Sequence, residues 1–443
     1  MAQSLNKDTA ARGTTTPDNG SVSNQQINAA VERHLPDIVA LRRAIHAEPE
    51  VGFEEERTAA KVVAYLAPLG LEIKQGLAVH GISALLQGGA PAPGGMDRRP
   101  VFGIRADLDA LAVEEQTGLP FASTVPGKMH ACGHDMHLAI VAGAAAVLRD
   151  LAPGLAGDIK FIFQPAEESG GKVVEGIDPF VEFRRALGGA QRMIKDGVMA
   201  NPTVDAIAGL HCWPELPVGT VGVDPKVAMG GNGVLRVRIK GRGGHGATPH
   251  LTLDPVPVAA TAILALQTLV SRANDPADPF VVSITTIHAG TAVNVIPEKV
   301  EFQATLRSVR PGYLETDIPQ RAIRMVRGIA DAYGLDCDVA CGPGLPVTVN
   351  DPAMVERAIE ATSSILGPDK VQKLDRISLT SEDFAYYAQE VPGVYIKVGV
   401  AGADGCPPLH NPRFAPQEDA LAVGVRTLVR MAVDFCDRPT LKQ

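Results

Sequence analysis

The stretch DMHLAIVAGAAAVLRDLAPGLAGDIKFIFQ, residues 135–164, decides the fold of the chain. It predicts a helix from Asp135 to Asp150, followed by a strand from Ile159 to Gln164. A further strand is expected before it, at Val101–Asp107, and another after it, at Ala206–Leu210. Strands that alternate with helices are typical of an α/β fold, so we predict a mostly parallel sheet with helices on both faces.

The segments on either side extend this pattern. Two amphipathic helices are expected at Asn28–His46 and Glu54–Leu69. A strand at Ser83–Gln87 then precedes Val101–Asp107, and we expect the two to form a β-meander. Near the end of the chain, a strand at Val394–Val400 and a helix from Glu418 to about Phe435 resume the α/β pattern.

A module with a different pattern begins at Gly230-Gly231. Its predicted elements follow the order βαββαβ of a ferredoxin-like unit. They are Val234–Lys240, Pro255–Ser271, Phe280–His288, Lys299–Arg307, Tyr313–Tyr333 and a strand near Cys337. We therefore expect residues 230–342 to be inserted into a larger domain made of residues 27–229 and 343–443. Residues 1–26, rich in Ser, Thr, Asn and Gly, are expected to be a disordered tail.

Composition excludes several classes of function. A chain of 443 residues predicts two domains. Its net charge of −9, without a long basic run, argues against a nucleic-acid partner. No run of eighteen apolar residues and no secretory h-region is present, so we expect neither a membrane span nor export. Six scattered cysteines do not form a disulfide framework, and a cytoplasmic protein with reduced thiols is expected.

Two segments carry residue types suited to metal chemistry. Cys132 and His134 are two residues apart, so in an extended segment both side chains would project to one side and could bind one ion, for example zinc. Glu167 and Glu168 follow a strand, so one carboxylate could bind metal while the other acts as a general base. Taken singly, each segment is better explained by a structural alternative: a buried cysteine beside a structural histidine for the first, and a solvated acidic pair for the second.

Single histidines follow in two other places. His211 ends an apolar strand, and His410 lies near the end of the chain. Like the glutamate pair and the segment of Asp107, His211 is expected at the carboxyl end of a strand. Ligand sites of open α/β sheets lie at that edge, so the separate signals converge on one site.

These segments resemble the M20 metallopeptidase family, in its amidohydrolase branch, which includes hippurate, auxin-conjugate and acetyl-diaminopimelate hydrolases. The matching motifs, in family order, are RADLDAL (105–111), HACGHD (130–135), QPAEE (164–168), GLH (209–211), GGHG (243–246), NVIP (294–297), SEDF (381–384) and LHNP (409–412). The resemblance implies a two-metal centre of zinc or manganese, with cobalt or nickel as further candidates. Its ligands would be Cys132, His134, Glu168, His211 and His410.

The resemblance also assigns roles around the metals. Glu167 would be the general base, and Asp107 an orienting carboxylate behind the ligands. The inserted module would be a lid through which the chain forms a homodimer. His245 would reach the partner's site to support the oxyanion, while Asn294 and Arg307 would hold the substrate's carboxylate or amide oxygen. A turn residue and a surface cation are the plain alternatives for the last two.

The implied activity is hydrolysis of the amide bond of N-acyl amino acids or related small amides, with water as the nucleophile. An N-carbamoyl or ureido amidohydrolase, a dipeptidase, and a metal-binding scaffold protein remain alternatives. A cysteine nucleophile at Cys132 would leave Glu168, His211 and His410 unexplained. The chain departs from the family in an insertion, Lys172–Gln191, which we expect to form an extra helix that reshapes the acyl pocket.

Overall fold

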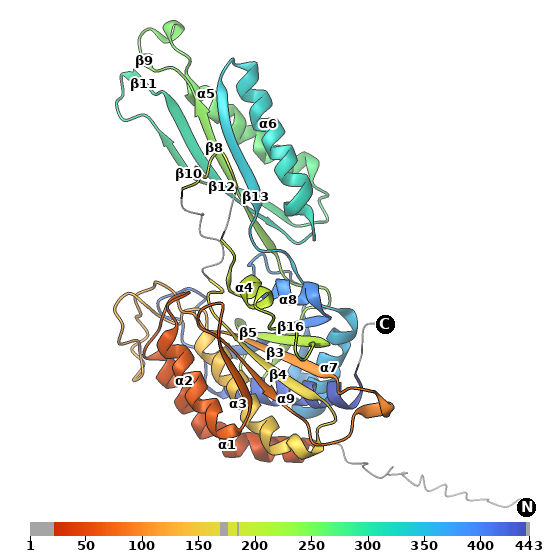
Figure 1. Ribbon diagram of the computed structural model, residues 1–443. Coiled ribbons are helices and arrows are strands. Elements are labelled where there is room, and N and C mark those ends of the chain that lie inside the picture. Colours follow the sequence, from red (N-terminus) through yellow and green to blue (C-terminus); the bar gives the residue numbers. More distant parts are fainter. Residues whose placement is uncertain (1–21, 169–175, 184–185, 440–443) are drawn as a thin grey trace, which may run out of the picture.

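The computed structural model describes residues 22–168, 176–183 and 186–439, and these residues form two units, each built around its own sheet (Figure 1). The larger unit contains both ends of the described chain. The smaller unit projects from it and is joined to it by two segments of the chain. The expected mixed α/β class is confirmed. Residues 1–21 of the predicted tail lie outside the described residues.

The sheet of the larger unit has eight strands in the order β1-β2-β4-β3-β5-β16-β6-β15. Their bounds are β1 Glu72–Leu77, β2 Gly81–Leu86, β3 Val101–Asp107, β4 Asp158–Gln164, β5 Ala206–Pro217, β6 Val221–Val223, β15 Val371–Lys373 and β16 Gly393–Ala401. The four central strands, β4-β3-β5-β16, run parallel to one another. The expected β-meander is wrong: β2 pairs antiparallel with β4, because the helix after β3 returns the chain beside it as a parallel neighbour.

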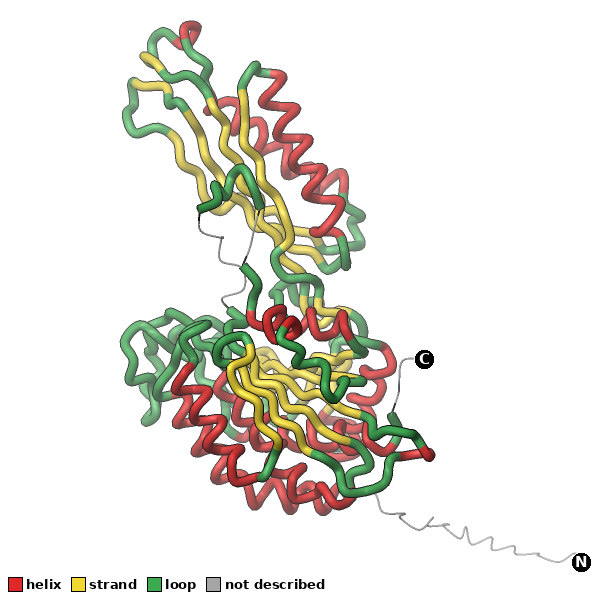
Figure 2. The backbone as a smooth tube through the Cα atoms, in the orientation of Figure 1, coloured by secondary structure: helices red, strands yellow, loops and turns green. Residues whose placement is uncertain are grey.

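Helices cover both faces of this sheet (Figure 2). Helices α1 Asn24–His46, α3 His134–Leu151, α7 Pro352–Leu366 and α9 Asp419–Asp437 pack together on one face, and α2 Glu56–Leu66 packs on α1 and α3. The short helices α4 Gly189–Lys195 and α8 Phe384–Glu390 lie on the other face. Alternate residues of β5 serve the two cores, with Ala208 in the first and Ile207 in the second. α1 begins before the expected residue because Ser23 and Gln26 form a capping box.

The smaller unit has the predicted βαββαβ order. Its elements are β8 Gly231–Lys240, α5 Pro255–Thr268, β10 Phe280–Ala289, β12 Lys299–Ser308, α6 Ile318–Ala332 and β13 Asp336–Pro343. The strands pair antiparallel in the order β10-β12-β8-β13, and both helices pack on one face. A two-stranded ribbon, β9 Gly244–His245 with β11 Val295–Ile296, forms the tip farthest from the larger unit. β7 Val227–Met229 and β14 Thr348–Val349 pair where the chain enters and leaves the unit.

The insertion after Glu168 is not the expected helix. Residues 172–175 and 184–185 lie outside the described part, residues 176–183 and 186–188 form turns and coil, and a helix begins only at Gly189. The ring of Phe183 fills the space above Gly342, where a Cβ would come within 2.2 Å of it. Phe180 lies under the guanidinium of Arg238, 4.5 Å from its ring centroid. These aromatic residues therefore pack on β13 and β8 of the smaller unit and not against one another along a helix.

Two helical stretches are long and apolar enough to cross a membrane, judged by length and composition alone. The first, His134–Gly154, is the core helix of the larger unit, with 83% of its most apolar window buried. The second, Pro255–Ala273, has only 28% of that window buried and exposes Val256 and Leu264. The absence of a membrane span stays a prediction, and the second stretch leaves apolar side chains exposed.

Candidate active site

A cavity of about 670 Å³ opens between the two units, above the carboxyl ends of the central parallel strands. Its walls combine the acidic and metal-ligating side chains of the larger unit with polar residues of the smaller one. They include Cys132, Glu167, Glu168, His211 and His410 on one side, and Asn232 and Arg307 on the other. The cavity therefore collects five residues from four separate motifs of the sequence.

Cys132 and His134 come close together for a different reason than expected. The chain between them is not extended, because Gly133 has a left-handed φ of +84° and His134 is already the first residue of α3. The turn nevertheless places one ligand atom each of Cys132, His134 and His211 within 4.8 Å of one another. The Cys132 Sγ lies 3.4 Å from the His211 Nε2.

The orientation of His134 leaves one ring nitrogen free. Its Nδ1 donates to the backbone carbonyl of Asp109 at 2.8 Å. Its Nε2 is buried and has no partner among the described residues. A buried, unpaired nitrogen lone pair beside a thiol and a second imidazole is suited to a metal ion.

The two glutamates are held by a strained loop. Ala166 has a φ of +54°, which is unusual for a residue with a side chain. The N–H groups of Glu167 and Glu168 donate to the carboxylate of Asp109 at 3.1 and 2.9 Å. The Glu168 carboxylate then meets His410 Nε2 at 3.0 Å, while Glu167 Oε1 accepts from the backbone N–H of Asp383 at 3.3 Å. The two adjacent carboxylates thus have separate partners.

His137 is a buried residue of this site that the sequence interpretation missed. Its Nδ1 donates to Asp107 at 2.8 Å, and its Nε2 accepts from the backbone N–H of Cys212 at 2.9 Å. Both nitrogens are therefore occupied, so His137 is a poor ligand although its ring lies 4.8 Å from that of His211. Asp107 is closer to His137 than to His134, whose Nδ1 is 3.8 Å away. The spacing of His134 and His137 on one helix face was the available signal.

β5 is longer than expected. It runs from Ala206 to Pro217, so His211 lies within the strand and not at its end. Its pairing with β3 nevertheless stops at Gly209, and beyond that residue the parallel neighbour is β16. His211 therefore faces the cavity at the point where β3 ends.

Burial and charge shift the ionisation of these groups. Burial and the carboxylates of Glu168 and Glu167 raise the pKa of the Cys132 thiol well above its ordinary value. Burial and the nearby Glu382 and Glu168 likewise raise the pKa of Glu167. Burial alone would also raise the pKa of Glu168, but His410 and His134 outweigh it and lower that pKa. Without positive charge the site disfavours a Cys132 thiolate, which is the form that attacks carbon or binds metal.

A network of buried acids surrounds a single arginine behind the cavity. Arg105 contacts Asp107 at 2.8 Å, Asp383 at 2.6 Å and Glu382 at 3.0 Å. Glu167 and Glu168 add further negative charge at the cavity wall. Buried charges are costly unless paired, so the excess of carboxylates, together with the free His134 nitrogen, fits a site for divalent cations.

The three residues expected from the lid, His245 for the oxyanion and Asn294 and Arg307 for the substrate, lie in two different places. Arg307 lines the cavity and donates to Ser381 Oγ at 3.2 Å, with no carboxylate partner among the described residues. His245 and Asn294 are exposed at the tip of the smaller unit, where β9 pairs with β11. The single chain therefore brings Arg307 to the site and keeps His245 and Asn294 away from it.

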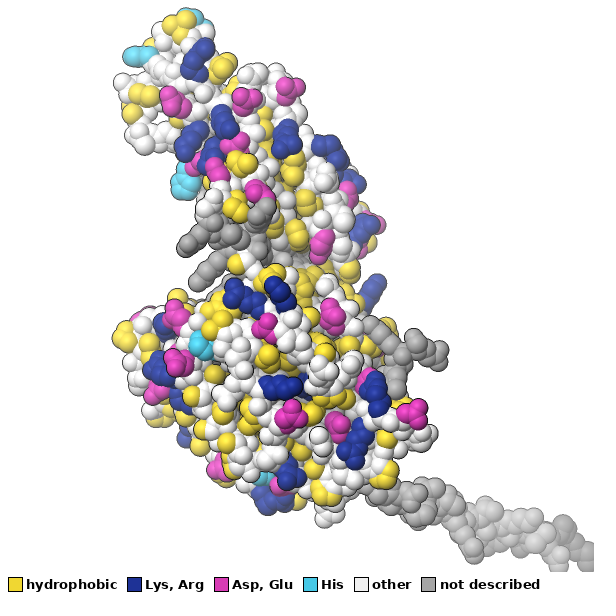
Figure 3. Space-filling model, in the orientation of Figure 1, with side chains coloured by type: hydrophobic (Ala, Val, Ile, Leu, Met, Phe, Trp, Pro, Cys, Tyr) yellow, Lys and Arg dark blue, Asp and Glu magenta, His cyan; other side chains and the backbone are white. Residues whose placement is uncertain are grey.

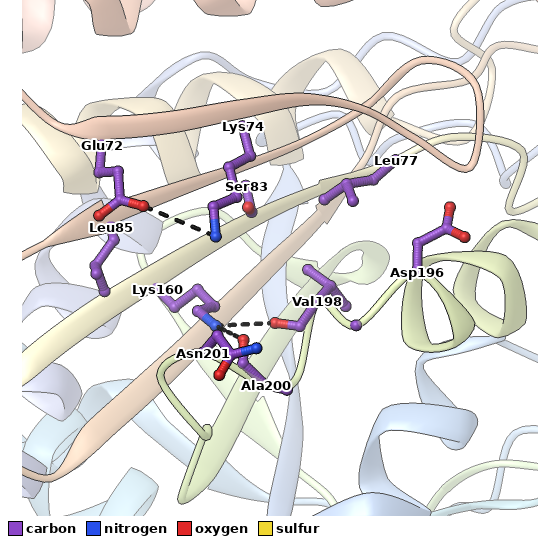
Figure 4. A pocket seen from close by; sticks show the side chains of 11 residues that line it. Glu72, Lys74, Leu77, Ser83, Leu85, Lys160, Asp196, Val198, Ala200 and Asn201 are labelled. Atoms are coloured by element: carbon purple, nitrogen blue, oxygen red, sulfur yellow. Dashed lines mark hydrogen bonds and ion pairs between the residues drawn. The ribbon is translucent and has the colours of Figure 1, made fainter.

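A second, smaller pocket of about 140 Å³ lies at the edge of the large sheet (Figure 4). The buried ammonium of Lys160 points into it and donates to the carbonyls of Val198, Ala200 and Pro202 at 2.7 to 3.1 Å. Burial lowers the pKa of Lys160 to about 8. Its three donors are all used by backbone, so Lys160 closes a loop and is not available for chemistry.

Known proteins match this chain over most of its length. The model of peptidase family M20/M25/M40 matches residues 103–434. The N-acetylcysteine deacetylase of Bacillus subtilis is 36% identical over 396 residues, covering 89% of this chain and 96% of its own length. An IAA-amino acid hydrolase of Arabidopsis thaliana, ILR1-like 2, is 32% identical and covers 90% of this chain and 85% of its own length. The crystal structure of a dinuclear metal binding peptidase of the M20 family from Bacillus subtilis is 32% identical, with a TM-score of 0.74 over 92% of this chain and 99% of that one.

Proposed function

Because the chain belongs to peptidase family M20/M25/M40, we propose that it is a metal-dependent hydrolase that cleaves the amide bond of N-acyl amino acids. The two relatives named above carry names of enzymes that act on an N-acetyl and an indole-acetyl amino acid. The observation that supports the proposal most strongly is the cavity lined by Glu167, Glu168 and Cys132, with a ligand atom of His134 within 4.8 Å of both glutamates. It joins a carboxylate base to a set of metal-ligating atoms.

Two divalent ions would be held by the ligands that line this cavity. Cys132, His134 and His211 form one group of ligand atoms within 4.8 Å, and Cys132, Glu168 and His410 form another. The shared thiolate and the imidazoles suit zinc or manganese, with cobalt or nickel as further candidates. When bound, such ions lower the pKa of water and polarise the substrate carbonyl.

Glu167 is the general base in this proposal. The residue is only 7% exposed and lines the cavity, and its carboxylate accepts from the N–H of Asp383. Burial and neighbouring acids raise its pKa above that of an ordinary glutamate, which favours uptake of a proton from water. It then returns that proton to the departing amide nitrogen. Asp107 would support the site from behind, because it binds His137 Nδ1 and lies 3.8 Å from the Nδ1 of the ligand His134.

Arg307 would bind the carboxylate of the amino-acid part. It is the cavity's guanidinium without an acidic partner in the described chain, and burial lowers its pKa, which indicates that it is partly stripped of water. A planar guanidinium pairs with a carboxylate through two parallel hydrogen bonds. The carboxylate of an anionic substrate would therefore be the negatively charged partner of the Arg307 guanidinium.

Residues 230–342 would serve as the lid and as the dimer contact. The exposed apolar residues of this unit include Leu251, Leu253, Val256, Leu264, Ile287, Val293 and Val295. They lie on and beside α5, on the edge strand β10 and at the tip of the unit. Figure 3 shows hydrophobic and histidine side chains together at this tip. A second copy placed against this surface would cover it and carry His245 and Asn294 toward the partner's cavity. All six cysteines are unpaired, which suits the reducing cytoplasm.

A substrate screen combined with metal analysis tests the proposal. Purified enzyme would be offered N-acetyl, N-benzoyl and indole-acetyl amino acids alongside N-carbamoyl amino acids and dipeptides, before and after chelation. We expect turnover of the N-acyl compounds, loss of turnover on chelation and recovery with manganese or zinc. Preference for N-carbamoyl substrates would indicate the ureido alternative. Metal binding without turnover of any amide would indicate a scaffold protein.

A further inference from the structure

A buried carboxylate lies beneath the loop that carries the two glutamates. Glu55 is fully buried, and its Oε1 accepts a hydrogen bond from the backbone N–H of Ala166 at 2.7 Å. Its Oε2 has no partner among the described residues. The segment that carries Glu55 is tied to the site, because the carbonyl of Glu50 accepts from the N–H of Ala110 at 2.7 Å.

The residue that Glu55 holds is the strained one. Ala166 has a φ of +54°, a left-handed conformation that a Cβ disfavours. The next two N–H groups, of Glu167 and Glu168, are bound by the carboxylate of Asp109. Three successive N–H groups of the loop are thus held by carboxylates from two other segments. Of these three bonds, the one to Glu55 is made by the strained residue itself, whose carbonyl also accepts from Gly189 at 3.4 Å.

We propose that Glu55 is a positioning residue for the hydrolysis, which holds Ala166 in its left-handed conformation and so aims Glu167 into the cavity. The inference rests on the proposed function, because it assumes that Glu167 is the base. It reaches beyond that function by assigning a role to a residue that does not line the cavity.

Charge supports a functional reason for Glu55 over a purely structural one. No cationic side chain contacts its carboxylate among the described residues, and burial together with the charge of Asp109 raises its pKa to about 7. An acid buried without a cation is costly to the fold. An apolar side chain of the same length would suit stability better, but it would leave the Ala166 N–H without an acceptor.

Two matched substitutions test this role. Glu55→Met removes the acceptor and fills nearly the same volume, whereas Glu55→Gln keeps an oxygen that can accept from Ala166. We expect Glu55→Met to lower kcat by about ten- to a hundredfold, with KM, metal content and Tm close to those of the parent enzyme. Glu55→Gln should retain most of the parent kcat. A merely structural role would move Tm and leave kcat per folded, metal-loaded chain unchanged.

Rescue provides a second measurement. Glycine adopts the left-handed conformation freely, so adding Ala166→Gly to Glu55→Met should recover part of the lost kcat. Parent-like kcat in Glu55→Met, or no recovery in the double variant, overturns the positioning role. Glu167→Gln is measured in parallel: if it retains turnover, the proposed base is wrong, and that result is distinct from a failure of Glu55 alone. If Glu55→Met does not fold, Ala166→Gly in a Glu55→Asp background gives the same comparison.

Discussion

The Nδ1 of His134 donates to the backbone carbonyl of Asp109 at 2.8 Å, and this bond decides which atom of His134 is free to bind. The carbonyl can only accept, so Nδ1 carries the proton and Nε2 keeps its lone pair. The carboxylate of the same aspartate holds the N–H groups of Glu167 and Glu168. Asp109, in the loop that follows β3, thus orients both His134 and the loop of the two glutamates.

Metal occupancy should separate His134 from His137. Both are buried on α3, but only His134 has an unoccupied nitrogen. We expect His134→Gln to lose metal even at high metal concentration, while His137→Gln still binds it, with affinity reduced about ten- to a hundredfold. Elemental analysis of both variants after equilibration with manganese or zinc would measure this. Equal loss in the two variants would contradict the tautomer assigned to His134.

The two adjacent glutamates should behave differently. Glu167→Gln should keep its metal and lose about 10²–10⁴-fold in kcat, because it removes proton transfer. Glu168→Gln should lose both metal and turnover, because Glu168 lies with Cys132 and His410 among candidate ligands. Metal content and kcat measured on the same samples check the difference. Substantial turnover by Glu167→Gln would rule out its role as base.

His245 should act across a dimer. It is exposed at the tip of the smaller unit, away from the cavity of its own chain. If it serves the neighbouring cavity, heterodimers of His245→Ala with Glu167→Gln subunits contain one site with both residues intact. We expect isolated heterodimers to regain up to about half of the parent activity, because one of their two sites is intact. Absence of recovery in heterodimers verified by two affinity tags would exclude the arrangement.

The insertion should matter more for its contact with the smaller unit than for the enzyme's preference among acyl groups. Asp178 contacts Arg238 at 2.6 Å, and none of the residues 176–183 or 186–188 lines the cavity. Asp178→Asn combined with Phe180→Ala should therefore change kcat/KM for small and aromatic acyl groups by the same factor. That factor should be within about fivefold, since exposed ion pairs contribute ~0–1 kcal/mol. A changed ranking of acyl groups would instead support the original expectation that the insertion shapes the pocket.

Stability should fall in alkaline solution through His46. Burial opposes protonation of this residue, but the charge and hydrogen bond of Asp135 outweigh burial and raise its pKa to about 9 from 6.5. A raised pKa means that the folded chain holds the extra proton. The stabilisation of the fold by protonated His46 is fully present below pH 6.5 and is lost as pH rises through about 9.

Denaturant unfolding of the parent enzyme and His46→Gln between pH 6 and 10 tests this. The free energy of unfolding of the parent should decline by an extra ~1.4 kcal/mol per pH unit within the window, relative to the variant. Parallel pH dependences of the two proteins would mean that His46 is not protonated in the folded state.

The sequence by itself determined the features that depend on local pattern. The spacing of apolar residues sufficed for the βαββαβ unit and for the strands β3, β4 and β16, because strand and helix periodicities are properties of neighbouring residues. The motifs also identified the residues that gather at the cavity, Cys132, His134, Glu168, His211 and His410. The sequence alone suffices to identify them as candidate ligands, because thiol, imidazole and carboxylate groups are the ligands that divalent ions such as zinc prefer.

Only the tertiary structure decided how those groups are held. The bond from Ala166 to Glu55 joins residues 111 positions apart, and no local pattern marks it. The spacing of His137 from His134 marked it as a neighbour of the site, but only the fold shows that the N–H of Cys212 occupies its second nitrogen. The aromatic residues of the insertion suggested a helix, yet they found partners at Arg238 and Gly342 on another sheet. Hydrogen bonds and ring contacts depend on the approach of distant segments, so their partners exist only once the chain has folded.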